Sequence, residues 1–214
     1  MTTLFAVTPI HVGPHELARR QARYDALSPA GLTVELADVG PGAPRSLDDE
    51  QQVRDSEGMV VAALEQAPDH ADALMPDCVL DPGVPDLSKR LERPVFGLLR
   101  TSIGWSALSG RAVGAVTRND AIAAELARQV EVYGYGPVFT GVEVLDLDVD
   151  AIHQADRWAV ALRGVVQRMA SAGAGDLVNG CSAVDLPAEA ATWPVRVVDP
   201  TALTLRLVAA GEAS

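Results

Sequence analysis

Residues 71–83 read ADALMPDCVLDPG, and residues 175–187 read GDLVNGCSAVDLP. Each segment starts as a short apolar run, reaches a cysteine, and then passes through aspartate into a proline or glycine turn. Apolar runs of this length without alternation are typical of strands buried on both faces of a parallel sheet. Cys78 and Cys181 are the only cysteines of the chain. We therefore expect each cysteine to follow directly on a buried strand.

Short β-like runs alternate with helical patterns along the rest of the chain. The expected strands are 4–8, 32–36, 71–76, 95–99, 112–117, 138–144, 176–179 and 195–198. The expected helices are 15–27, 47–66, 120–130, 150–172 and 202–210, with two short ones, 84–92 and 186–192, after the cysteines. This alternation predicts an α/β protein with parallel sheets.

A weak internal repeat divides the sequence. The order Asp, Cys, Asp, Pro-Val occurs around Cys78 and again around Cys181. One interpretation is that αβ units often look alike. The other is two pseudo-symmetric Rossmann-like lobes that face each other across a cleft, with both cysteines at strand ends where ligands bind in open α/β sheets. We then expect a first lobe of residues 1–100, with a C-terminal helix of 200–214 packing back on it, and a second lobe of 101–199.

Composition restricts the classes of partner. The chain has 214 residues, 48% of them hydrophobic, and a net charge of −12, which argues against nucleic acid as a partner. No stretch approaches the roughly 20 apolar residues of a membrane span, and residues 1–8 read as a first strand rather than a signal peptide. We expect a cytoplasmic protein with reduced thiols.

Two thiols in matched contexts permit a specific chemistry. One thiolate can remove a proton from a carbon next to a carbonyl, and the other thiol can return a proton on the opposite face, with no cofactor. The alternative is that each cysteine is a small buried hydrophobe. A metal site is not expected, because the chain has no Cys-x-x-Cys motif and its four histidines lack ligand spacing.

Both cysteine segments resemble those of the aspartate/glutamate/hydantoin racemase superfamily, and the hydantoin (allantoin) racemase branch in particular. The first resemblance is Cys78 followed by Asp81-Pro82-Gly83 and then Pro94-Val95-Phe96-Gly97. The second is Asn179-Gly180-Cys181-Ser-Ala followed by Pro194-Val195-Arg-Val-Val-Asp199-Pro200. Residues 113–117 resemble the strand and threonine that open the second lobe. The similarity runs in order from about residue 71 to the C-terminus.

The resemblance implies a cofactor-independent isomerase with its active site in the cleft between two lobes. It implies Cys78 and Cys181 as the acid/base pair, Thr117 as a contact of a substrate carboxylate or carbonyl, and backbone amides around Val79 and Ser182 as anion donors. The substrate would be a small hydantoin-like or amino-acid-like molecule that carries a carbonyl or carboxylate. The superfamily is commonly oligomeric, so the resemblance also implies a homo-oligomer.

The chain departs from the family pattern beside these residues. The usual Asn-Pro-Asn-like loop is Thr8-Pro9-Ile10-His11, which keeps only Pro9, and the second cysteine is preceded by Asn179-Gly180. Arg100 stands where an acid is usual. It is either a solvated strand-end residue or a partner for a substrate carboxylate, and His11 and Arg118 have the same two interpretations.

These departures leave other functions open. One alternative is a repurposed member of the superfamily that uses a single cysteine, such as a cis–trans isomerase or a decarboxylase. The other is a non-catalytic small-molecule-binding protein on the same fold.

Overall fold

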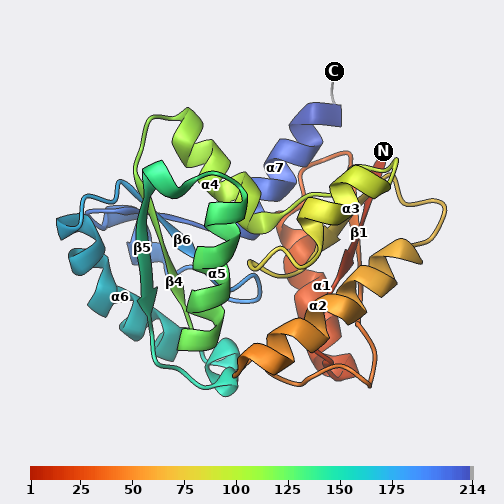
Figure 1. The fold of residues 1–214 in the computed structure, drawn as a ribbon, viewed down its shortest axis with the longest axis horizontal. Coiled ribbons are helices and arrows are strands. Elements are labelled where there is room, and N and C mark those ends of the chain that lie inside the picture. Colours follow the sequence, from red (N-terminus) through yellow and green to blue (C-terminus); the bar gives the residue numbers. More distant parts are fainter. Residues whose placement is uncertain (213–214) are drawn as a thin grey trace. The chain divides into compact units, whose positions relative to one another are not determined.

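Two parallel sheets, each with its own helices, make up the protein (Figure 1). The computed structural model describes residues 1–212 and divides into two units. The first unit contains residues 1–98 together with the C-terminal helix from Thr201 onward, and the second contains residues 99–200. The α/β fold class with parallel sheets predicted from the sequence is confirmed. Within the described residues, no helix has the length and apolarity needed to cross a membrane.

The first unit has a three-stranded sheet in the order β2-β1-β3. Its elements are β1 (Thr2–Val7), α1 (Pro14–Leu27), β2 (Leu32–Ala37), α2 (Glu50–Glu65), β3 (Ala73–Pro76), α3 (Val84–Arg90) and α7 (Pro200–Glu212). All four residues of β3 are buried, as expected for a strand that is covered on both faces. Leu205 and Val208 of α7 pack with Leu4 and Tyr24 in one core cluster of this unit.

The second unit has a four-stranded sheet in the order β5-β4-β6-β7. Its elements are α4 (Leu98–Leu108), β4 (Val113–Thr117), α5 (Asp120–Val132), η1 (Gly136–Val138), β5 (Phe139–Val144), η2 (Val149–His153), α6 (Ala155–Ser171), β6 (Asp176–Asn179), η3 (Ala188–Thr192) and β7 (Arg196–Val198). Trp158 and Leu162 of α6 pack against Val116 and Leu177 of the sheet. Asp176, the first residue of β6, is fully buried.

The two sheets have equivalent strand orders. In each unit the first strand lies between the second strand and the third, so β3 beside β1 corresponds to β6 beside β4. Beyond β3, Val95 makes an isolated parallel bridge to Leu74, in the place that β7 occupies beyond β6. The next helix along the chain then belongs to the other unit: α4 follows the Val95 bridge into the second unit, and α7 follows β7 into the first.

Several details of the predicted secondary structure are wrong. Helix α4 was not expected, and the short helix expected at 186–192 is the 3₁₀ helix η3. The strand expected at 95–99 is reduced to the bridge at Val95, because the chain turns at Gly97 and begins α4 at Leu98. The helix expected at 150–172 is two elements, η2 and α6, separated by Gln154, which has φ −122° and ψ 76°. Residues 213–214 of the expected C-terminal helix lie outside the described residues.

Candidate active site

Both cysteines occupy the same position relative to their sheets. Cys78 is the second residue after β3, which ends at Pro76, and Cys181 is the second residue after β6, which ends at Asn179. Both strands lie beside the first strand of their unit and run parallel to it. Each thiol therefore lies at the carboxyl edge of its sheet, where open α/β sheets bind ligands.

Cys78 lies in a tight, buried loop. Its side chain is 7% exposed, and its Sγ accepts a hydrogen bond from the backbone N–H of Leu80 at 3.5 Å. This amide belongs to the loop and not to α3. Asp81 closes the loop with φ +50° and is fully buried. It fills the space beside Gly97, where an added Cβ would lie 2.3 Å from Asp81 Oδ2.

A cluster of buried polar residues holds the residue before this thiol. Asp77 is 1% exposed and its backbone N–H donates to the carbonyl of Val7 at 2.7 Å. Its Oδ1 accepts from the hydroxyl of Tyr24 at 2.8 Å, and its Oδ2 accepts from Nη1 of Arg20 at 3.2 Å. Burial raises the pKa of Tyr24 well above its ordinary value, and the adjacent Asp77 carboxylate adds to the effect. The phenol therefore remains protonated and can donate.

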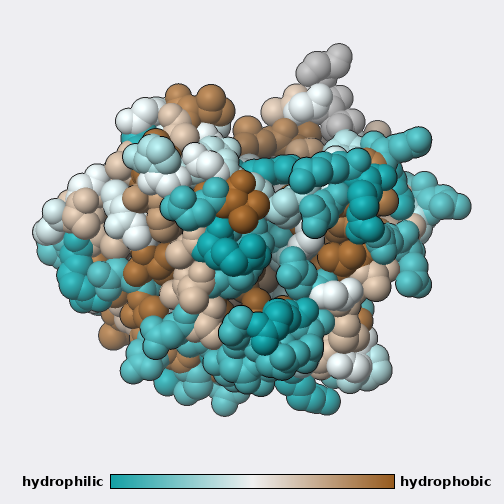
Figure 2. All heavy atoms as spheres, viewed as in Figure 1, coloured by the Kyte–Doolittle hydropathy of each residue, from teal (hydrophilic) through white to brown (hydrophobic). Residues whose placement is uncertain are grey.

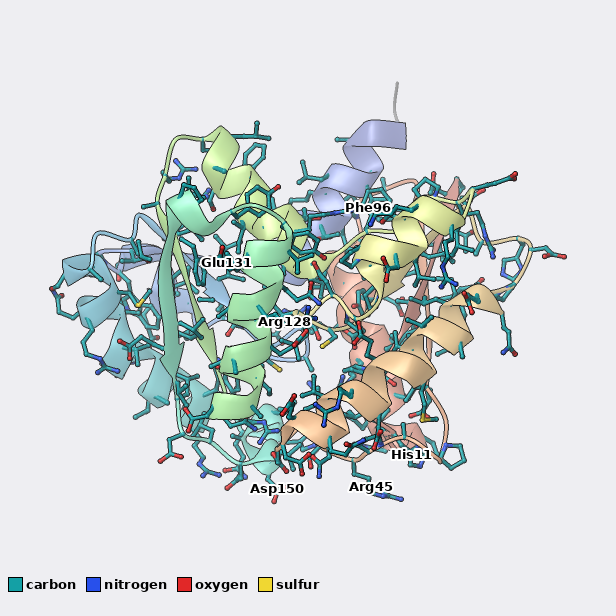
Figure 3. The ribbon with its side chains drawn as sticks, in the orientation of Figure 1. His11, Arg45, Phe96, Arg128, Glu131 and Asp150 are labelled. Atoms are coloured by element: carbon teal, nitrogen blue, oxygen red, sulfur yellow. The ribbon has the colours of Figure 1, made fainter. Side chains whose placement is uncertain are left out.

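The loop after β1 is braced by hydrogen bonds on the same edge of the sheet. Asp38, after β2, accepts from His11 Nδ1 at 2.9 Å and from the backbone N–H of Val12 at 2.6 Å; His11 is labelled in Figure 3. Burial acts to raise the pKa of Asp38, but these hydrogen bonds outweigh it and the pKa falls. The carbonyl of Pro9 accepts from Ser56 Oγ at 2.5 Å. The loop is therefore ordered without the asparagines of the family pattern.

The loop of the second cysteine is held by a neutral amide. Asn179 is fully buried; its Oδ1 accepts from the indole Nε1 of Trp158 at 3.0 Å, and its Nδ2 donates to the carbonyls of Cys181 at 3.3 Å and Val184 at 3.4 Å. Gly180 is required by a close backbone approach, because an added Cβ would lie 1.9 Å from the carbonyl oxygen of Val116. Cys181 is more exposed than Cys78.

The predicted site residues fall into two groups and one outlier. Pro9, Cys78 and Val79 lie at the carboxyl edge of the first sheet, at the ends of the paired strands β1 and β3. At the same edge of the second sheet lie Thr117, Asn179, Cys181 and Ser182, where β4 and β6 pair. Arg100 does not end a strand: it lies in the first turn of α4 and is half-buried.

The side chain of Thr117 has a partner within its own unit. It is fully buried and its Oγ1 donates to the carbonyl of Asn119 at 3.3 Å. Asn119 in turn caps α5, because its side chain accepts from the backbone N–H of Ile122. Thr117 thus joins the end of β4 to the start of α5.

Sequence reasoning did not find the Asp77 cluster or the Trp158–Asn179 pair. The available signal was the spacing of polar side chains on α1. Glu16, Arg20 and Tyr24 follow one another at intervals of four residues and so share one face of the helix. Their buried partner lies more than fifty positions away along the chain. Such a partner cannot be read from a local pattern.

The comparisons with known proteins agree with this arrangement of strands. A solved allantoin racemase from Pseudomonas fluorescens has a TM-score of 0.84 at 15% identity, and covers 99% of this chain and 91% of its own. An allantoin racemase from Klebsiella pneumoniae has a TM-score of 0.76 at 19% identity, over 100% of this chain and 88% of its own. At these identities the likeness concerns the fold.

The same fold occurs in a variant of arylmalonate decarboxylase, with a TM-score of 0.60 at 15% identity over 99% of this chain and 94% of its own. A search of curated protein sequences gave no significant match. The family model of the Asp/Glu/Hydantoin racemases matches residues 16–208, which include both cysteine loops and every strand except β1. The chain therefore belongs to the Asp/Glu/hydantoin racemase family, a family of isomerases.

Proposed function

We propose that this protein is a cofactor-independent racemase or epimerase in which Cys78 and Cys181 transfer protons at the α-carbon of a hydantoin-like or amino-acid-like substrate. The observation that carries the proposal is the equal placement of the thiols, each two residues beyond the third strand of its unit. A proton abstraction and a proton return on opposite faces of one carbon require two such groups.

The proposed reaction needs no change in oxidation state. The thiolate of one cysteine takes the α-proton, the C–H electron pair moves into the adjacent carbonyl, and an enolate forms. The thiol of the other cysteine then donates its proton to the opposite face of the α-carbon. The product has the inverted configuration, and the roles of the two sulfurs are exchanged, so the reverse reaction begins from the product state.

Other residues of the two strand ends are proposed to bind the substrate. Backbone amides at Val79 and Ser182 would donate to a substrate carbonyl or carboxylate, in the manner of an oxyanion site. Pro9 and Thr117 would shape the pocket at the neighbouring strand ends. Asn179 would act on substrate through the Cys181 loop, since its amide is engaged by Trp158 and by that loop.

Arg100 is proposed to supply a cation for a substrate carboxylate. Arg100 lies in the first turn of α4 and not in a cysteine loop, so its role in binding can be tested without changing the thiols. An Arg100→Ala variant should raise KM for a carboxylate substrate such as an amino acid and leave KM for uncharged allantoin unchanged. An unchanged KM for both substrates would remove Arg100 from the binding site.

The direct test is exchange in deuterated water. Allantoin, 5-substituted hydantoins, aspartate and glutamate would be incubated with the protein, with loss of the α-proton followed by NMR and loss of optical rotation by polarimetry. Cys78→Ser and Cys181→Ser should each abolish racemisation, while exchange of one enantiomer can survive in each variant. Racemisation at the wild-type rate in either variant would refute the two-thiol mechanism.

The same experiment separates the alternative functions. If only one cysteine is needed, a covalent adduct at that cysteine in mass spectra would indicate a cis–trans isomerase, and carbon dioxide release from a malonate would indicate a decarboxylase. Slow alkylation of both native thiols together with no exchange on any substrate would indicate a binding protein.

We further propose a cytoplasmic homo-oligomer. Trp105 and Leu108 at the end of α4 expose 37% and 87% of their surface, and Figure 2 shows hydrophobic residues gathered over this end of the helix. Light scattering should give a mass above that of one chain, and Leu108→Glu should lower it if this surface is in the contact. A wild-type mass of one chain would refute the assembly.

A further inference from the structure

The residue before Cys78 is a fully enclosed carboxylate, and stability alone does not explain its presence. Asp77 is 1% exposed and its partner Arg20 is 4% exposed. Taking two charges out of water costs several kcal/mol per ion, and replacing a buried ion pair with apolar residues of similar volume is often neutral or stabilising. A buried carboxylate directly beside a reactive thiol is therefore better explained by what it does to that thiol.

The contacts around Asp77 form a continuous chain from α1 to the thiol loop. Glu16 accepts from Arg20 Nε at 2.8 Å, Arg20 donates to Asp77 at 3.2 Å, and Tyr24 donates to the other oxygen of Asp77 at 2.8 Å. Arg20 and Tyr24 are one helical turn apart, so α1 holds the carboxylate from two sides. Cys78 follows in the chain, about 3.8 Å away between Cα atoms.

The second cysteine has no such charge in the corresponding place. Its loop is held by the uncharged pair of Asn179 and Trp158, joined at 3.0 Å. The residue before Cys78 is the charged Asp77 and the residue before Cys181 is Gly180, although the two strands are equivalent. An asymmetry of this kind gives two acid/base groups different preferences for the proton.

We propose that Asp77 is a positioning residue for Cys78: the Arg20–Asp77–Tyr24 cluster fixes the backbone before the thiol, and the charge of the carboxylate favours the protonated form of that thiol. The proposal rests on the proposed role of Cys78 in proton transfer. It assigns Cys78 as the thiol that begins the cycle as proton donor. Cys181, beside the uncharged pair, begins it as the thiolate.

The charged and titratable groups around Asp77 set the expected signs. Arg20 and Tyr24 face it from α1; Glu16 binds Arg20, and Arg23 lies close enough to Tyr24 to act on its charge. Asp81 is buried three residues after Cys78. Removing the negative charge of Asp77 should favour the Cys78 thiolate, and removing the positive charge of Arg20 should disfavour it.

The test measures the pH dependence of Cys78 alkylation by iodoacetamide in a Cys181→Ser background, where Cys78 is the only thiol. Asp77→Asn keeps the shape and the acceptor for Tyr24 but removes the charge. It should lower the alkylation midpoint by roughly 1–2 pH units, as expected for a unit charge roughly 7–12 Å away at an effective dielectric constant of ~20. Arg20→Gln should raise the midpoint.

The matched control is Asp72→Asn. Asp72 lies just before β3, at the opposite end of the strand, and its Oδ2 accepts from the backbone N–H of Thr3 at 2.7 Å. This variant should leave the midpoint unchanged. Tyr24→Phe keeps the charge of Asp77 and removes one of the two hydrogen bonds that hold its carboxylate. It should lower kcat and leave KM unchanged in the protein with both cysteines, and it should leave the alkylation midpoint unchanged in the Cys181→Ser background.

The outcomes separate this inference from the proposed function, because alkylation requires no substrate. An unchanged midpoint in folded Asp77→Asn, with folding verified by circular dichroism, would overturn the inference even if the protein racemises. If Asp77→Asn does not fold, Arg20→Gln provides the test, because it should raise the alkylation midpoint. An unchanged midpoint in Arg20→Gln would also overturn the inference. The expected shifts in a protein that exchanges no substrate proton would instead count against the proposed function.

Discussion

Replacement of Gly180 by alanine tests how closely the Cys181 loop must approach β4. The new Cβ would lie 1.9 Å from the carbonyl oxygen of Val116, whereas real Cβ atoms keep at least 3.0 Å from such a neighbour. The obstructing atom is backbone, so a side-chain rotation cannot relieve the clash. The end of β6 must therefore move away from β4 by about 1 Å, and Cys181 is the next residue.

A displacement of about 1 Å at a reacting group can cost about 100-fold in rate, and overpacking of this kind costs about 1–3 kcal/mol of stability. We expect Gly180→Ala to lower kcat for α-proton exchange by about 100-fold, measured by NMR in deuterated water, and to lower the free energy of unfolding, measured by urea titration. Gly175→Ala is the matched control just before the other end of β6, because its Cβ would meet only the Arg111 side chain at 3.5 Å. Wild-type exchange and wild-type stability in Gly180→Ala would refute the argument.

Three further substitutions test the elements that support the site. Trp158→Phe removes the indole donor of the buried Asn179 and should cost about 1–3 kcal/mol in urea titrations. A loss below about 0.5 kcal/mol would contradict the importance of the bond. Burial acts to raise the pKa of Asp176, but hydrogen bonds from Arg196, Ser106 and Arg111 lower it overall, so its contribution is complete above the ordinary value of 3.8 and is lost as the pH falls through the lowered value. Asp176→Asn should therefore flatten the acid end of the stability–pH curve, and an unchanged curve would exclude this linkage. Leu205→Ala, in the core cluster that contains α7, should cost about 2–5 kcal/mol and reduce hydrogen-exchange protection in residues 1–98; full protection there would show that α7 contributes little to that core.

Local signals were sufficient to predict many of the elements. The helix expected at 120–130 begins where α5 begins, and the side chain of Asn119 caps it by accepting from the backbone N–H of Ile122. The apolar run at 176–179 predicted β6 with its observed bounds. In both cases neighbouring residues alone determine the structure, through a capping hydrogen bond or continuous burial.

The failures came from features that depend on distant residues. Val95, Leu98 and Leu99 form part of an apolar run that fits a buried strand as well as a buried helix, and the choice is made by tertiary packing after Gly97, where Asp81 fills the adjacent space. The equivalent positions of the two cysteines could be predicted because their sequence contexts repeat. The Arg20–Asp77 ion pair could not, since nothing local indicates which carboxylate a buried arginine will reach.

The assignment of α7 to the first unit has a consequence for how the chain is made. Residues 1–98 lack Leu205 and Val208, which share a core cluster with Leu4 and Tyr24, until α7 has been synthesised. The second unit, residues 99–200, has all its elements earlier. On the ribosome, where N-terminal domains ordinarily fold first, the later half of this protein should therefore complete its core before the earlier half.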